Sequence, residues 1–217
     1  MDILDLIEQL TDSDRWPGFR DPERLDKLDE IAEKAFKRET FDGTLASILI
    51  THQICDELLR QLISQSRFAL RLAVASGGFE MKFGRKNNDE DLDGLMTGQL
   101  LQRLESCIEF DEKKRILSLS GEMSSIRNKF AHELATRVDL DGIRGTATKY
   151  RAKFTELEEL FEIAADNFHL YFKDHRKNDS WDFQLADMLE NGLEAEWEIR
   201  CRQVVKQRRD AGFGDHT

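Results

Sequence analysis

The sequence predicts an all-α protein, an up-and-down bundle of four to five long helices with helical extensions at both ends. Only two prolines occur in 217 residues, Pro17 and Pro22, so most of the chain lacks the residue that interrupts helices most strongly. From Thr40 onward, apolar residues recur at intervals of three and four, and the period-two alternation of strands is nearly absent. We therefore expect long helices joined by short links.

The chain is expected to have three parts. Residues 1–39 form an N-terminal helical extension, where "DPERLDKLDEIAEKAF" carries a capping Asp21 and a proline, Pro22, at the first helical position. Residues 40–175 form the bundle, and residues 176–217 form a C-terminal helical arm. The predicted buried stripe of the first helix consists of Leu25, Leu28, Ile31, Ala32 and Phe36.

Within the bundle, "TLASILITHQICDELLRQLI" is predicted to be the central helix, because its apolar positions spread wider than one stripe. The polar segment "GRKNNDEDLDG" is predicted to be an exposed loop. Thr97 is expected to cap the next helix and Asp111 to start the one after it. The segment "RVDLDGIRG" is predicted to be a turn or loop before the last long helix.

Charge and cysteine content limit the function classes. The net charge of −11 disfavours a broad nucleic-acid footprint, which depends on many Lys and Arg contacts to phosphates. The basic cluster Arg200–Arg209 is interpreted as a solvated helix end. The cysteines Cys55, Cys107 and Cys201 are odd in number and lack metal-ligand spacing, so neither a disulfide nor a metal site is expected. No cofactor is expected either.

The amino terminus "MDILDLIEQLTDSD" is acidic and amphipathic, unlike a signal peptide. No apolar run approaches the roughly 20 residues that a membrane span needs. We therefore expect a cytoplasmic protein with no membrane association.

The segment "SSIRNKFAHELA", residues 124–135, is more specific than helix packing requires. With about 100° per residue, its positions can be assigned to sectors around a helix axis. The core sector consists of Met123, Ile126, Phe130 and Leu134. A strip of small residues consists of Ser124, Ala131 and Ala135, with Asn128 beside them. Arg127 and His132 border this strip and lie about 140° apart.

This arrangement has the parts that metal-independent RNA cleavage requires. An arginine such as Arg127 can hold a phosphate with two hydrogen bonds. The imidazole of His132 can donate or accept a proton near neutral pH. Asn128 is four residues before His132 and can orient its ring or bind an oxygen. Cleavage needs a base for the 2′-hydroxyl, an acid for the leaving 5′-oxygen and a cation for the developing charge.

The segment "RNKFAH" resembles the R-x-x-x-x-H motif of the HEPN superfamily of α-helical bundles. The form "IRNKFAH" is also similar to the mannitol repressor family of regulators. The resemblance covers about residues 40–173 and implies a homodimer whose two motifs face each other. It also implies that catalytic members are metal-independent ribonucleases, with the catalytic roles here on Arg127 and His132 and a supporting role on Asn128.

Other interpretations of these residues stay open. Arg127 and Asn128 would have a purely structural role if they tied the helix to the following loop, with His132 a satisfied half-buried histidine. "HELAT" resembles the zinc motif H-E-x-x-H, but Thr136 stands at the second histidine position. His52 is interpreted as a polar side chain at the core edge. The alternative is that it lies in the groove formed along the strip of small residues.

Two functions are compatible with these residues. The first is an endoribonuclease for single-stranded RNA, of a toxin or antiviral defence type, with an antitoxin as a partner. The second is a non-catalytic regulatory or scaffold dimer that holds a protein partner. Both are expected to be homodimers through the strip of small residues, since small side chains permit close approach across a two-fold axis.

Overall fold

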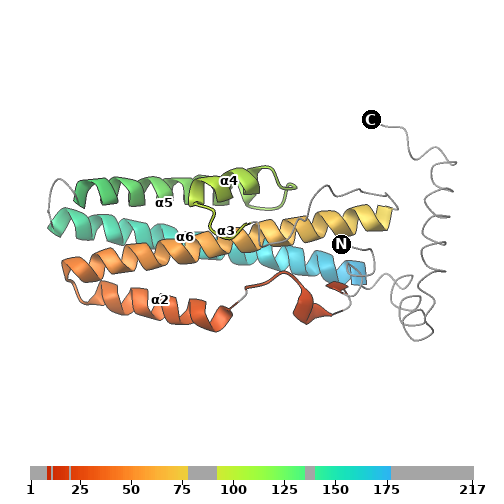
Figure 1. Ribbon diagram of the computed structural model, residues 1–217, viewed down its shortest axis with the longest axis horizontal. Coiled ribbons are helices and arrows are strands. Elements are labelled where there is room, and N and C mark those ends of the chain that lie inside the picture. Colours follow the sequence, from red (N-terminus) through yellow and green to blue (C-terminus); the bar gives the residue numbers. More distant parts are fainter. Residues whose placement is uncertain (1–8, 11, 20, 78–91, 135–139, 177–217) are drawn as a thin grey trace. The chain divides into compact units, whose positions relative to one another are not determined.

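The computed structural model describes residues 9–10, 12–19, 21–77, 92–134 and 140–176, which contain five α-helices and no strand (Figure 1). The α-helices are α2 (Pro22–Lys37), α3 (Phe41–Gly77), α4 (Thr97–Glu105), α5 (Lys113–Leu134) and α6 (Leu140–Arg176), and a short 3₁₀ helix, η1 (Ser13–Arg15), precedes them. The predicted all-α bundle is confirmed for this part of the chain. The C-terminal arm from residue 177, including Arg200–Arg209 and Cys201, and most of the loop predicted near residues 84–94 lie outside the described residues.

Contacts group the chain into two compact units. The larger unit comprises Pro17–Ser66 and Asp89–Asn167. It therefore holds α2, α4, α5 and the first parts of α3 and α6. The smaller unit comprises Met1–Trp16, Arg67–Asn88 and Phe168–Thr217, and its described residues include η1 and the last parts of α3 and α6.

Helix α2 begins as the sequence predicts. Asp21 Oδ1 accepts a hydrogen bond from the Arg24 backbone N at 3.0 Å, and Pro22 takes the first helical position. The buried stripe differs in part from the prediction. Ala32 is fully buried, whereas Ile31 is 50% exposed.

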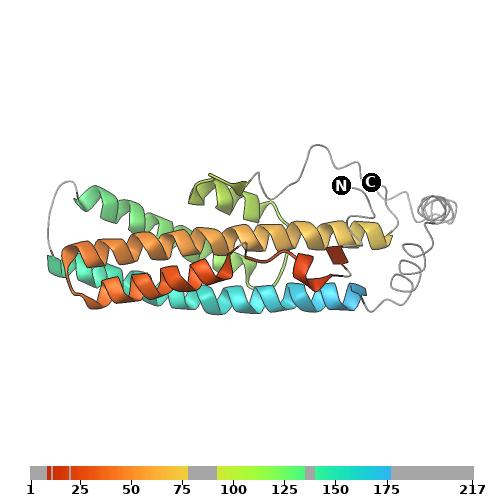
Figure 2. The same cartoon turned by 60° about the horizontal axis from the view of Figure 1, so that its bottom comes forward.

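The turn between α2 and α3 depends on a close approach. Glu39 has a φ of +58°, which reverses the chain after α2, and Thr40 Oγ1 then accepts a hydrogen bond from Gly43 N at 3.2 Å. A Cβ at Gly43 would lie 2.4 Å from the carbonyl oxygen of Ala35. Glycine is therefore required at this position, and α2 lies beside the start of α3 (Figure 2).

Helix α3 is central to the larger unit. Its buried apolar side chains occupy adjacent positions on successive turns, so the helix is covered on more than one side. They are Ile48, Ile54, Cys55, Leu58, Leu59, Leu62 and Ile63. The prediction from the wide apolar face is confirmed, although Leu49, which belonged to that face, is 41% exposed.

Two predicted helix starts are wrong. The N-cap of α4 is Met96, whose backbone N donates to Gln99 Oε1 at 3.0 Å. Thr97 is instead the first helical residue, and its hydroxyl bonds to side chains of α3. Asp111 precedes α5 by two residues, and its Oδ2 accepts a hydrogen bond from Asn167 Nδ2 of α6 at 3.0 Å.

The start of α6 also differs from the prediction. The segment predicted as a turn up to Gly145 is helical from Leu140, while residues 135–139 lie outside the described part. Glycine disfavours a helix interior by about 1 kcal/mol. Ile143 and Ala147, one turn apart, are 7% and 0% exposed, so their packing overrides the local preference.

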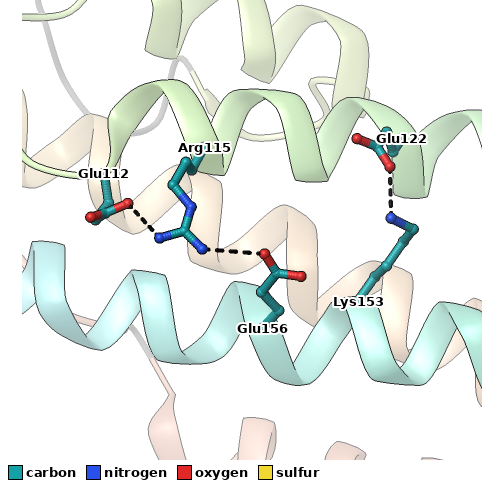
Figure 3. Close-up of polar contacts among 5 residues, drawn as sticks. All are labelled: Glu112, Arg115, Glu122, Lys153 and Glu156. Atoms are coloured by element: carbon teal, nitrogen blue, oxygen red, sulfur yellow. Dashed lines mark hydrogen bonds and ion pairs between the residues drawn. The ribbon is translucent and has the colours of Figure 1, made fainter.

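Ion pairs connect α5 to α6 in the larger unit (Figure 3). Arg115 binds Glu112 Oε2 through Nη1 at 3.2 Å and Glu156 Oε1 through Nη2 at 3.4 Å. Lys153 Nζ lies 2.6 Å from Glu122 Oε2. Such partly exposed ion pairs add little to the free energy of folding. We infer that they mainly set the register of α5 against α6.

A second set of contacts connects α2 to α6. Arg151 forms an ion pair with Glu33, and its guanidinium carbon lies 5.2 Å from the centre of the Phe36 ring. Nearby on α6, partial burial raises the pKa of Glu158 to about 7, and the neighbouring carboxylates of Asp29 and Glu162 add to the rise. This carboxyl is therefore only partly ionised at neutral pH.

The described part of the smaller unit has an aromatic cluster. The Phe172 ring is fully buried and packs edge-on against Phe68, with ring centroids 4.8 Å apart, and against Trp16 at 5.6 Å. Trp16 Nε1 donates to the Leu10 carbonyl at 3.0 Å. The indole thus joins the segment before α2 to α6 with its polar atom satisfied.

Candidate functional site

The motif predicted to carry function lies on the last turns of α5. Arg127 is half-buried, whereas Asn128 and His132 are exposed. Arg127 Nη1 donates a hydrogen bond to Asn128 Oδ1 at 2.9 Å. Asn128 thus contacts the arginine, a contact that helical spacing did not predict.

The core side of this helix is as predicted only in part. Met123 and Phe130 are 0% and 2% exposed, and Ile126 is half-buried. The side chain of Leu134 lies outside the described part. The predicted core sector is therefore confirmed at Met123 and Phe130.

The strip of small residues lies at the surface of the described chain. Ser124 is half-buried, Asn128 and Ala131 are exposed, and Ala135 lies outside the described residues. His132, at the margin of the strip, is exposed as well. Its imidazole is thus accessible to a ligand, as a proton-transfer role would require.

A buried chain of hydrogen bonds joins three other helices. His52 of α3 is 6% exposed, and its Nδ1 lies 2.7 Å from Oη of Tyr150 on α6. The other ring nitrogen, Nε2, lies 2.9 Å from Oγ1 of Thr97, the first residue of α4. Thr97 Oγ1 in turn donates to Asp56 Oδ1 at 2.8 Å. The four side chains form one continuous chain from Tyr150 to Asp56.

The Asp56 carboxylate, at one end of this chain, fixes the direction of every hydrogen bond in it. A carboxylate only accepts hydrogen bonds, so the Thr97 proton points toward Asp56. Thr97 Oγ1 then accepts from Nε2–H of His52. A neutral imidazole carries one proton, so Nδ1 accepts the hydrogen bond that Tyr150 O–H donates.

The charge of Arg127 acts on the His52 and Tyr150 side chains of this buried chain. Burial lowers the pKa of His52 and so keeps the imidazole neutral, Asp56 opposes this shift, and the positive charge of Arg127 adds to it. Burial raises the pKa of Tyr150, and Arg127 acts in the opposite direction. One guanidinium therefore acts on both members of the His52–Tyr150 pair.

The inner edge of Arg127 has unused hydrogen-bonding capacity. Its Nε is buried and has no hydrogen-bond partner among the described residues. Burying a guanidinium N–H without a partner costs free energy. The bond to Asn128 uses one donor, so most of the five donors of this side chain are unused in the described structure.

Most of this chain could not be found from residue order alone. His52 was expected at the core edge, whereas its side chain is buried and bonded at both nitrogens. Tyr150 was assigned only to an apolar helix face, and Thr97 to a cap. The available signal was the spacing of His52 and Asp56, four residues apart on the central helix, which places both on one side of it.

Cys55 lacks the character of a nucleophile. Cys55 is fully buried, and burial, aided by the charge of Asp56, raises the pKa of its thiol to about 12. Such a thiol stays protonated at neutral pH. Cys107 is half-buried, and its Sγ lies 3.3 Å from the Arg103 carbonyl.

Comparisons with known proteins do not assign a family. No protein-family model matches the chain, and no match was found among curated proteins or among solved structures. Within the described ranges, no helix has a stretch long and apolar enough to cross a membrane. The same ranges contain no group of three or more His, Cys, Asp or Glu side chains placed to hold a metal ion.

Proposed function

We propose that this protein is a metal-independent endoribonuclease that cleaves single-stranded RNA, with Arg127, His132 and Asn128 as its site residues. The single observation that carries the proposal is the state of Arg127. Its half-buried guanidinium makes one hydrogen bond in the described structure, from Nη1 to Asn128, and so keeps terminal N–H donors for a ligand. A phosphate, which accepts two hydrogen bonds from one arginine, is the ligand class that such a group fits best.

The roles of the three residues follow from their places on α5. Arg127 binds a non-bridging phosphate oxygen and stabilises the charge that develops on it. Asn128 holds the outer edge of the guanidinium through Nη1. His132 is exposed and transfers the proton, a role to which the imidazole side chain is suited near neutral pH.

The reaction is a transesterification within the RNA. The 2′-oxygen loses its proton to a base and forms a bond to phosphorus, while the bond from phosphorus to the 5′-oxygen breaks. The leaving 5′-oxygen takes up a proton from the acid. The products are a 2′,3′-cyclic phosphate and a 5′-hydroxyl, and DNA is not a substrate because it lacks the 2′-hydroxyl.

A homodimer is part of this proposal. Arg127 and His132 lie about 140° apart around α5, so one helix presents them in different directions. The exposed strip with Asn128 and Ala131 permits a two-fold contact that places the two motifs side by side. Arg127 of both protomers would then neutralise one phosphate.

The test is an RNA cleavage assay with purified protein and mixed single-stranded RNAs. Cleavage is expected to persist in EDTA and to leave 2′,3′-cyclic phosphate ends. Arg127→Ala and His132→Ala should each lower the rate by about 10²- to 10⁴-fold. The matched control is Lys129→Ala, which removes a cation on an exposed position of the same helix. Absence of cleavage at high enzyme concentration, or equal rates in all variants, would contradict the proposal.

A non-catalytic regulatory or scaffold dimer is the second candidate. The net charge of −11 favours it, since an acidic surface repels RNA and leaves a protein as the better partner. Both candidates predict the same dimer, so RNA cleavage separates them. A dimer without cleavage would favour the regulatory role.

A further inference from the structure

Helix α4 is fastened at its two ends by side chains of different chemistry. At its C-terminal end, Lys113 Nζ donates to two backbone carbonyls, at and just after the end of the helix. At its N-terminal end, Thr97 Oγ1 accepts from His52 Nε2 at 2.9 Å and donates to Asp56 Oδ1 at 2.8 Å. A helix of nine residues is marginal by itself in water, so α4 depends on its attachments to the rest of the unit.

His52 and Asp56 share Thr97 Oγ1 as a hydrogen-bond partner. They lie four residues apart on α3, a spacing at which two side chains of one helix can touch. His52 is 6% exposed, whereas Asp56 is half-buried. The neutral imidazole donates to Thr97 through Nε2 and accepts from Tyr150 through Nδ1. Neutral His52 therefore bonds to two other helices rather than to the carboxylate on its own helix.

A proton on His52 is incompatible with this arrangement. Both nitrogens of an imidazolium donate, so Nδ1 can no longer accept from the Tyr150 hydroxyl at 2.7 Å. Tyr150 is 0% exposed, and the loss of a buried hydrogen bond costs free energy. A buried charge without a paired counter-charge is costlier still. Asp56, one turn along α3, is a charged acceptor that the imidazolium can reach.

We propose that His52 is a pH-sensitive switch, which on taking up a proton leaves Tyr150 and forms an ion pair with Asp56. The imidazolium then displaces the Thr97 hydroxyl from the carboxylate. In the neutral state the switch ties α4 and α6 to α3. In the protonated state the bond to α6 is lost and the first turn of α4 loosens, while the end held by Lys113 stays fastened. Such a local change of charge partners is a common form of molecular switch.

The groups around His52 set the pH range of this change. Burial lowers the pKa of His52, the charge of Asp56 on α3 opposes this, and the charge of Arg127 on α5 adds to it. Tyr150 faces it from α6, where burial raises the pKa of the phenol, Cys55 and Asp56 add to the rise and Arg127 opposes it. The described contact from α4 is an uncharged hydroxyl. Because the folded-state pKa of His52 lies below the ordinary 6.5, the unfolded chain takes up the proton first, and His52 makes stability fall as the pH falls below about 6.5.

The test is nuclear magnetic resonance of the full chain across the titration of His52, whose signals are assigned by their loss in His52→Gln. As His52 takes up a proton, its contact with the Tyr150 ring, at a centroid distance of 6.3 Å in the structure, should disappear. Protection of the Gln99 and Leu100 amides against hydrogen exchange, corrected for the intrinsic rate, should fall by about fivefold, as the loss of one hydrogen bond predicts. The Leu104 amide, at the other end of α4, should keep its protection.

Two variants and a control isolate the role of His52. His52→Gln keeps a donor and an acceptor but does not take up a proton, so the pH response at the first turn of α4 should vanish. Asp56→Asn keeps an acceptor without the negative charge. It should move the His52 titration to lower pH, because the charge of Asp56 raises this pKa. His175→Gln removes a half-buried histidine of the smaller unit and should change neither the response nor its midpoint.

Three outcomes would overturn the switch. The first is a His52 titration that leaves the protection at the first turn of α4 unchanged, and the second is a pH response that persists in His52→Gln. The third is global unfolding of the parent before His52 is protonated, because the exchanged state would then never be populated in the folded protein. If His52→Gln does not fold, Asp56→Asn still decides, since an unchanged or raised midpoint of the His52 titration contradicts the ion pair.

Discussion

Lys113 is the clearest case of a single polar side chain on which the larger unit depends. Lys113 is 3% exposed, and its Nζ donates to the backbone carbonyls of Glu105 at 3.0 Å and Cys107 at 2.7 Å. The ammonium also lies 3.6 Å from Glu109 Oε1, on a side chain that is 77% exposed. These carbonyls lie at and just after the end of α4, where the helix has unpaired acceptors and a partial negative charge.

We predict that Lys113→Met destabilises the protein by about 2–4 kcal/mol. Each hydrogen bond from a charged donor contributes about 1.5–3 kcal/mol, and methionine leaves both carbonyls without their donor. Part of this loss is offset, because the variant no longer buries an ammonium group. The exposed ion pair with Glu109 adds little to the sum.

The assay is urea unfolding followed by circular dichroism, with Lys114→Met as the matched control. Lys114 is exposed on the same turn, and its substitution should change the free energy of unfolding by less than about 0.5 kcal/mol. If Lys113→Met is as stable as the parent or more stable, the cost of burying the ammonium exceeds its hydrogen bonds, and the reasoning is refuted.

Three further predictions concern pH, packing and assembly. The folded-state pKa of Glu158, about 7, lies above its ordinary value of 4.5, so stability should fall as the pH rises between these values. Glu158→Gln should then stabilise the protein at pH 8 by about 1–2 kcal/mol, after allowance for solvent screening, and have little effect near pH 4.5. Gly43→Ala should lower the melting temperature, because its Cβ would meet a carbonyl oxygen at 2.4 Å. Gly121→Ala should raise or preserve the melting temperature, because its Cβ would meet nothing within 4 Å. A lower melting temperature for Gly121→Ala than for Gly43→Ala would contradict the packing argument. If the protein forms the proposed homodimer, Ala131→Leu should shift it toward monomer in sedimentation. A monomeric parent at micromolar concentration would remove the basis for a shared site.

Local chemistry explains which sequence predictions are correct. Asp21 caps α2 because its side-chain oxygen reaches the backbone N of Arg24, a contact that depends on a few neighbouring residues alone. The helical class and the central place of α3 follow from the spacing of apolar side chains, which requires no knowledge of the partners. The burial of Phe130 follows in the same way.

Only the tertiary structure decides how the polar residues are used. Thr97 has the composition of a cap, but its hydroxyl bonds to His52 and Asp56, more than 40 residues away in the chain. Tyr150 looks like one aromatic among several on α6, yet it donates to a histidine 98 residues distant. The sequence by itself predicted the all-α class and the central place of α3, and it singled out Arg127, Asn128 and His132, because these follow from short-range periodicity and residue order. The buried chain from Tyr150 to Asp56 could not be predicted from the sequence, because hydrogen bonds between helices depend on which helix faces pack together, and no local pattern records that packing.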